Sequence, residues 1–268
     1  AATSALATAA DYELEGSRNE TFITLNATLM RLYIERHGIE ADRLSGFSIT
    51  AHHNAMTNPY ALFHKRLTPE DYCASRIVVD PLRLYDISPV CDGAAAVVLA
   101  NADVARQITR QSAGIRVAAS SVATMPLALT KRPDPLDLTA VRQSLQDALK
   151  QAGVDRNRMD LFELHDAYTI MTALSLEASG YAEAGQGWRM ADAERTGLRG
   201  ELPIATFGGL KARGHPVGAT GVYQIVEACL QLRGEAGENQ VPDPEFALTQ
   251  NIGGTGSSVV NHILQRVA

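Results

Sequence analysis

Three short segments of this 268-residue chain combine histidine, other polar residues and glycine in a way that suits catalysis. They are residues 165–168 (HDAY), 208–221 (GGLKARGHPVGATG) and 250–257 (QNIGGTGS). Imidazole exchanges a proton near neutral pH. Glycine lets a ligand approach the backbone closely and leaves amide hydrogens free to bind an oxyanion. Taken singly, each segment is typical of a tight turn or a packed histidine, so the prediction depends on their combination.

The elements expected around these segments place them at the ends of strands. Apolar runs and helical spacing predict strands over residues 161–164, 246–249 and 259–264, and helices over 169–179 and 222–232. The first segment lies where a strand passes into a helix, the second leads into a helix, and the third is a glycine turn between two strands. Loops at strand ends are where α/β folds bind ligands. Neither glycine-rich loop fits a nucleotide fingerprint.

The rest of the chain also alternates between the two kinds of element. Further helices are predicted over residues 22–32, 41–55, 103–109 and 141–152, with a capped helix start at Thr68, and a strand over 115–119. Residues 94–99 (AAAVVL) are a continuous apolar run of the kind found in a strand buried on both faces. The proline-containing loop 126–135 is the best internal boundary. This order predicts an α/β fold with a layered, helix-covered sheet.

Composition excludes several classes of protein. The chain has 24 Lys+Arg against 30 Asp+Glu and a net charge of −6, which argues against a nucleic-acid partner because phosphate binding needs a basic field. No apolar run approaches the roughly 20 residues that span a bilayer. The first ten residues hold no Lys or Arg and do not resemble a signal peptide. Three scattered cysteines predict neither a disulfide framework nor a metal site, and the expected compartment is the cytoplasm.

Together the motifs resemble the thiolase superfamily. Residues 165–168, 208–221 and 251–254 stand in the order of the C-terminal thiolase motifs, and 88–96 (SPVCDGAAA) resembles the segment that closes the N-terminal half. The match is closest to the sterol-carrier-protein type and to the related archaeal and bacterial acetyl-CoA acetyltransferases, and it covers nearly the whole chain. The resemblance implies a layered αβαβα sandwich of two similar halves.

The same resemblance implies how the chain divides. The first half, residues 1–113, would be incomplete and would carry a loop excursion over about 8–76. The second half, residues 114–268, would be complete. The segments around Gly93 and Asn251 would then lie in connected parts of one molecule.

The resemblance also implies roles for individual residues. A cysteine thiol takes the acyl group from coenzyme A, His215 activates that thiol, His165 stands where other thiolases have an asparagine, and the Gly253 amide belongs to a second oxyanion hole. The implied catalytic set is His165, His215, Gly253, Asn251 and Tyr168. Coenzyme A would be bound by Ser88, Gly209 and Gly254, and by the loops around His53 and Lys65. The thioester is a substrate, and no permanently bound cofactor or metal is implied.

Two departures from the family pattern bear on mechanism. The family nucleophile would lie upstream of residue 1, and Cys73, Cys91 and Cys229 are each expected to be small buried hydrophobes. Asn251 cannot titrate, although many thiolases have a cysteine acid/base there. The acid/base would be His165, which is expected to titrate near neutrality, Tyr168, or a group outside this chain.

Three functions remain open at this point. The first is an acyl-CoA acyltransferase, the second a thiolase-like aldolase that cleaves a β-hydroxyacyl-CoA such as a steroid side-chain CoA ester, and the third a non-catalytic subunit. Tyr168 is expected to be a packing residue in the first and a proton donor in the second. The resemblance further implies a homodimer and a small zinc-ribbon/OB-fold partner protein, with no nucleic acid and no membrane.

Overall fold

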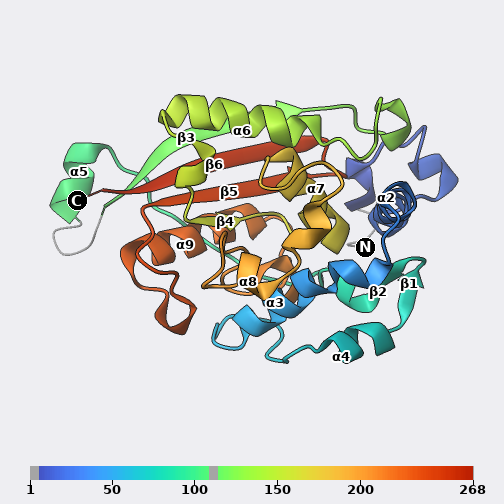
Figure 1. Ribbon diagram of the computed structural model, residues 1–268. Helices are drawn as coiled ribbons and strands as arrows, with labels where there is room; N and C mark the ends of the chain where they lie inside the picture. The colour runs from blue at the N-terminus through green and yellow to red at the C-terminus, as the bar shows by residue number, and fades with distance from the viewer. Residues whose placement is uncertain (1–5, 109–113, 268) are drawn as a thin grey trace.

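The computed structural model describes residues 6–108 and 114–267, and its centre is a mixed four-stranded sheet (Figure 1). The strands are β3 (Gly114–Thr124), β4 (Leu161–Glu163), β5 (Phe246–Gly253) and β6 (Ser258–Val267), in the order β3-β6-β5-β4. β6 is antiparallel to both β3 and β5, whereas β4 is parallel to β5. The predicted strand pair around the glycine turn is confirmed as β5 and β6.

Alternating side chains build a core on each face of this sheet. Phe246, Leu248 and Ile263 belong to the larger apolar cluster, whereas Ala247 and Leu264 belong to the smaller one. Helices α6 (Thr139–Ala152) and α7 (Thr169–Ala178) contribute to the larger cluster, and α9 (Thr220–Arg233) to the smaller. The sheet is therefore covered by helices on both faces, as predicted. Figure 1 shows α6 above it and α9 below it.

Two helices of the second half end at glycines, within one residue of the predicted ends at 152 and 232. α6 and α9 are followed by Gly153 and Gly234, both with positive φ, and each cap amide bonds back to a helix carbonyl. Both glycines have the left-handed backbone conformation, which residues with a Cβ rarely adopt. α7 begins directly after Tyr168, so residues 164–168 form the connection from β4 to α7.

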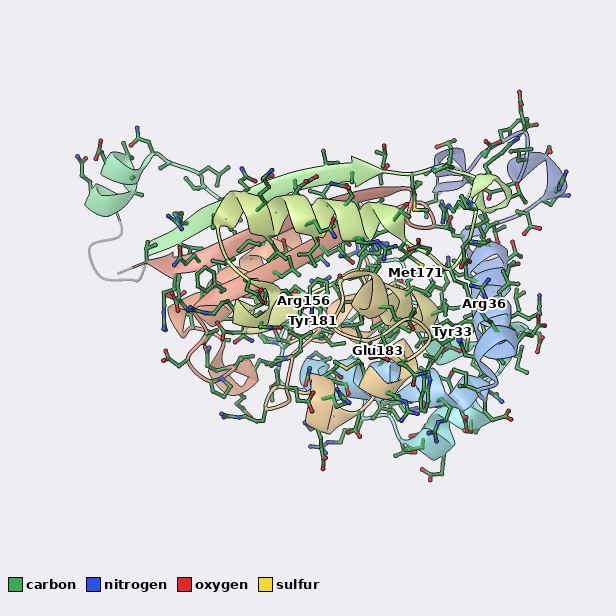
Figure 2. All side chains as sticks on the ribbon, turned by 45° about the horizontal axis from the view of Figure 1, so that its top comes forward. Tyr33, Arg36, Arg156, Met171, Tyr181 and Glu183 are labelled. Atoms are coloured by element: carbon green, nitrogen blue, oxygen red, sulfur yellow. The ribbon has the colours of Figure 1, made fainter. Side chains whose placement is uncertain are left out.

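The first half is mostly helical in the described residues. Its elements are α2 (Phe22–His37), α3 (Ser45–Ala55), α4 (Pro69–Ala74), α5 (Ala102–Ile108) and the short strand pair β1 (Ile77–Val79) and β2 (Leu82–Arg83). α4 starts at the predicted cap, Thr68, and the structure shows a capping box there, in which Thr68 and Asp71 accept from each other's backbone amides. Tyr33 of α2, labelled in Figure 2, donates a hydrogen bond to Glu177 of α7, so this half packs on the second. A short helix, α8 (Ala193–Thr196), lies beside α3.

The prediction of a buried strand over residues 94–99 is wrong. These residues have no regular structure, and Val98 and Leu99 are 93% and 79% exposed. A strand buried on both faces needs neighbouring strands and covering helices. Within the described residues the only sheets are the four-stranded one and the β1–β2 pair, and neither extends to this segment. The apolar run is genuine, but this fold leaves it without a partner.

Residues 109–113, where the predicted boundary at 113 falls, lie outside the described residues. Among the described helices none is long and apolar enough to cross a membrane.

Candidate active site

Two imidazoles from separate loops meet above the β4 end of the sheet. His165 follows β4 and is buried, whereas His215 lies in the loop before α9 and is half-buried. Their ring centroids are 5.2 Å apart and their planes are nearly perpendicular, at 86°. The structure therefore brings together the two histidines that the sequence analysis selected, from positions 50 residues apart in the chain.

Backbone bonds fix the loop of His215. Its amide donates to the carbonyl of Pro89 (2.9 Å), and its carbonyl accepts from the amide of Cys91 (3.4 Å). Its Nδ1 lies 2.7 Å from Oγ1 of Thr220, and that hydroxyl also donates to the Pro216 carbonyl. The first-half segment around residue 90 is thus a structural part of the site.

Burial keeps both imidazoles neutral. It lowers the pKa of His215 to about 4, with a smaller contribution from the positive charge of Arg213. Burial also holds the pKa of His165 well below 6.5, and His215, Arg213 and Lys211 act in the same direction. The expectation that His165 titrates near neutrality is wrong, because desolvation penalises the imidazolium. At pH 7 both rings are available as neutral donors and acceptors.

Asn251 connects the sheet to this pair. It lies on β5, and its Nδ2 is 3.3 Å from Nδ1 of His165 and 3.3 Å from Oε1 of Gln224 on α9. A side chain at Gly221 would crowd this amide, since a Cβ there would be 3.3 Å from Cγ of Asn251. The last glycine of the GATG motif therefore makes room for Asn251 beside the first turn of α9.

Gly209 likewise leaves room for a side chain of the site, the carboxyl group of Asp166. Its φ is +53°, and a Cβ would lie 2.4 Å from Oδ2 of Asp166. The other carboxyl oxygen of Asp166 accepts from the Leu210 amide at 2.7 Å. Gly209 starts the π-helical turn Gly209–Arg213, whose Lys211 donates to the backbone carbonyl of Asp86 (2.9 Å). Burial lowers the pKa of Lys211 to about 8.

Three buried ionisable side chains, Arg213, Glu227 and Glu163, form a cluster next to the site. Arg213 pairs with Glu227 at 2.6 Å, with side chains 2% and 5% exposed. Glu163, at the end of β4, accepts from the amide and the hydroxyl of Thr206. Burial and the neighbouring charge of Glu227 raise the pKa of Glu163 to about 8. Glu163 is therefore mainly protonated at neutral pH, and Arg213 and Glu227 neutralise each other.

A cleft of about 440 Å³ opens beside His215. It is lined by residues 91–95 on one side and by 216–219 with Val222 on the other. Ser88 lies nearby and donates its amide to the carbonyl of Ala167 (2.9 Å). Tyr168 is half-buried against the larger core cluster, and burial raises the pKa of its phenol to about 12. The cleft thus lies between two segments that carry the family motifs, residues 88–96 and 208–221.

The glycine turn follows Asn251 at the end of β5. Gly253 is exposed, and a Cβ on Gly254 would approach the Ala9 carbonyl and the Leu127 side chain. Within residues 6–108 and 114–267, no described contact joins either glycine to His165 or His215. Hydrogen bonding groups Asn251 with His165, whereas the role of Gly253, two residues further along β5, stays a prediction.

The cysteines do not form a nucleophile–base pair in the described residues. Cys73 is exposed, which contradicts the expectation that it is buried, because α4 packs through Tyr72 and turns Cys73 to solvent. Cys229 is partly buried beside the smaller core cluster. Cys91 lines the cleft, but the Nδ1 atom of His215 is engaged by Thr220 rather than by a thiol.

Several residues of the site had no clear sequence signal. Gln224, Glu227 and Gln231 of α9 are buried. Of the apolar residues that predicted this helix, Leu232 is buried, whereas Val222, Ile225, Val226 and Cys229 are only partly buried. The sequence therefore identified the helix but not its buried face. A regular polar spacing of 224, 227 and 231 within an otherwise apolar helix was the available signal.

Comparison with known proteins gives one consistent family. The sequence model of the family "Thiolase C-terminal domain-like" matches residues 120–266. An acetyl-CoA acetyltransferase of Methanothermobacter thermautotrophicus is 42% identical over 264 residues, which cover 98% of this chain and 68% of that protein.

Solved structures agree with that assignment at the level of the fold. The Ltp2–ChsH2(DUF35) aldolase matches with a TM-score of 0.79 and 22% identity, over 92% of this chain and 64% of that one. A monomeric SCP2-thiolase-like protein from Mycobacterium smegmatis matches with a TM-score of 0.67 and 18% identity, over 91% and 51%. The predicted thiolase-like α/β fold is confirmed. The chain spans only about half to two thirds of these relatives.

Proposed function

Because the chain belongs to the thiolase family, we propose that it is the larger part of an acyltransferase that acts on coenzyme A thioesters. The observation that carries this proposal is the pair of neutral imidazoles, 5.2 Å apart, beside a 440 Å³ cleft. Acyl transfer needs a base for a thiol and donors aimed at the thioester oxygen. A neutral His215 can accept the thiol proton, and a neutral His165 can donate a hydrogen bond.

We further propose that the thiol comes from outside residues 1–268, in a segment that completes the first half of the fold. Two observations support this. No cysteine thiol of the described residues is hydrogen-bonded to His215, and residues 94–99 are an apolar run without a strand partner. A thiolate held close to His215 would favour the imidazolium and raise the pKa of that ring from about 4.

Coenzyme A binding is proposed at the cleft between residues 91–95 and 216–219, with Ser88 and Gly209 as further contacts. The Ser88 amide donates to the carbonyl of Ala167, and Gly209 lies against Asp166. Both residues therefore contact the segment that follows His165. Gly254 directly follows β5, and its part in binding stays a prediction. His53 is exposed on α3, and Lys65 donates to the phenol of Tyr85 (3.1 Å).

An aldolase is the second candidate, and Tyr168 is the observation that favours it. Its phenol stays protonated because its pKa is about 12, so it suits the donation of a proton to the leaving enolate, while another group takes the proton of the alcohol. The Ltp2–ChsH2(DUF35) structure is described as an aldolase, although at 22% identity the likeness shows the fold alone. A DUF35-type partner, the homodimer and the division at residue 113 remain proposals.

The acyltransferase is tested by thiolysis of acetoacetyl-CoA in the complete gene product. His215→Ala and His165→Ala should each lower kcat/KM by about 100-fold or more. His262→Ala is the matched control, because His262 is also a partly buried histidine whose pKa burial lowers, but it lies on β6. Wild-type turnover by His215→Ala would refute the proposed role. The intact mass of the natural protein, compared with 28.8 kDa, tests the additional segment.

A further inference from the structure

The buried amide of Gln224 has only one possible orientation. Gln224 is 1% exposed, and its Nε2 lies 3.1 Å from the carbonyl oxygen of Glu163 and 2.9 Å from that of Gln250. Backbone carbonyls only accept hydrogen bonds, so the amide nitrogen must face them and uses both of its hydrogens there. The Oε1 atom of Gln224 is therefore left as an acceptor on the opposite side.

This orientation fixes Asn251 in turn. Nδ2 of Asn251 lies 3.3 Å from Oε1 of Gln224. Had the Asn251 amide been rotated, its own carbonyl oxygen would face Oε1, and two acceptors would be in contact. The nitrogen is therefore the atom that faces Gln224. The same Nδ2 lies 3.3 Å from Nδ1 of His165, so its second hydrogen points to the imidazole.

The amide hydrogen in turn determines where the proton of His165 resides. A protonated Nδ1 would place two donors against each other, whereas an unprotonated Nδ1 accepts the hydrogen bond. We propose that Gln224 is a positioning residue that acts through Asn251 to hold His165 as the tautomer protonated on Nε2. The structural assignment stands on these four distances, while its catalytic meaning rests on the proposed function.

The consequence is a division of labour between the two histidines. Within residues 6–108 and 114–267, Nε2 of His165 has no hydrogen-bond partner, so its N–H is free for a ligand oxygen. His165 then acts as a hydrogen-bond donor to the thioester oxygen rather than as a base. Desolvation, which keeps the ring neutral, prevents it from becoming a general acid near pH 7. The acid/base of the second substrate is left to Tyr168 or to a group outside this chain.

The tautomer is measured directly by ¹⁵N-histidine NMR on the chain without substrate at pH 7, where the two neutral tautomers give different nitrogen–proton correlation patterns. A His165→Gln sample identifies the signals of His165 among the seven histidines. We expect the pattern of the Nε2-protonated form, with at least a tenfold excess over the other tautomer, because the wrong tautomer loses a buried hydrogen bond. A predominant Nδ1-protonated form would overturn the proposal.

Matched variants test the part of Gln224. Gln224→Met removes the amide from the chain of bonds, which frees Asn251 to rotate and should reduce the tautomer excess about tenfold. Gln231→Met is the control: Gln231 is equally buried on α9 and also makes three side-chain bonds, to Asn239, Gln240 and Val241. The Gln231→Met variant should leave the signals of His165 unchanged. Equal signals in both variants would refute a specific role for Gln224.

A second variant covers the case in which Gln224→Met does not fold. Asn251→Asp replaces the donor with an acceptor and keeps the shape, so His165 should move its proton to Nδ1 or become charged. An unchanged Nε2 pattern in Asn251→Asp would overturn the proposal. Because these measurements need no substrate, the expected tautomer in a protein without acyl transfer would refute only the proposed function.

Discussion

The buried carboxyl of Glu163 should make the stability of this protein depend on pH in an unusual direction. Its pKa is raised from 4.5 to about 8, first by burial and then by the charge of Glu227. Between these two values the folded state holds a proton that the unfolded chain has lost. Stability therefore falls as the pH rises through this window. Most buried carboxylates with ionic partners have lowered pKa values and give the opposite slope.

The magnitude follows from linkage. One bound proton changes the free energy of unfolding by about 1.4 kcal/mol per pH unit. The window of about three and a half pH units corresponds to about 5 kcal/mol, and it applies without screening because Glu163 is 1% exposed. A loss of this size is comparable with the whole stability of many domains. It should therefore be visible in ordinary urea unfolding.

Glu163→Gln isolates the effect. Glutamine keeps the oxygen that accepts from the amide and hydroxyl of Thr206 (3.0 and 2.5 Å) and copies the neutral form of the acid. The stability of the variant minus that of the wild type should rise by about 4 kcal/mol between pH 5 and pH 8 and then level off. The measurement is urea unfolding at pH values from 5 to 9. A difference that is flat or falls over this range would refute the reasoning.

Glu227→Gln provides a second check. The charge of Glu227 raises the pKa of Glu163, so its removal should lower that pKa and let Glu163 ionise beside Arg213. The stability of this variant should then stop falling at a lower pH than in the wild type. An unchanged midpoint would show that the two carboxyls do not interact.

Three further outcomes are expected. Tyr168→Phe, which removes only the hydroxyl, should leave kcat/KM for acetoacetyl-CoA nearly unchanged in an acyltransferase, but should lower it by about 100-fold for a β-hydroxyacyl-CoA in an aldolase. Gly209→Ala should lower the free energy of unfolding by about 1–3 kcal/mol in chemical denaturation, because its Cβ would lie 2.4 Å from Oδ2 of Asp166 at a φ of +53°. Val98→Lys should change the stability of this chain by less than about 0.5 kcal/mol, since Val98 is 93% exposed, but should be strongly destabilising in a longer protein that covers the segment.

The sequence predicted the parts of the fold whose causes are local. The cap at Thr68 predicted the start of α4, helical spacing predicted α6 and α9, and apolar runs around a glycine turn predicted β5 and β6. Each of these signals lies within a few residues of the element that it defines.

The errors came from causes that are distant along the chain. Residues 94–99 have the composition of a buried strand, but a strand needs partners that no local pattern can supply. The pKa of His165 depends on burial beneath other elements, so its expected value near neutrality was wrong. The sequence analysis did not select Gln224. Its role depends on the pairing of β4 with β5, which places the carbonyls of Glu163 and Gln250 within hydrogen-bond distance of the Gln224 amide.

The segment that joins the two halves at the site is fastened differently from the sheet beneath it. Ser88, Pro89 and Cys91 contact residues 167 and 215 through three separate backbone hydrogen bonds, whereas β5 and β6 pair at eight consecutive positions. Because only three hydrogen bonds hold this partly exposed segment, little free energy is needed to open it locally. The amides of Ser88 and His215 should therefore exchange with deuterated solvent long before those of β5. Local opening of this segment can therefore occur many times while the core stays folded.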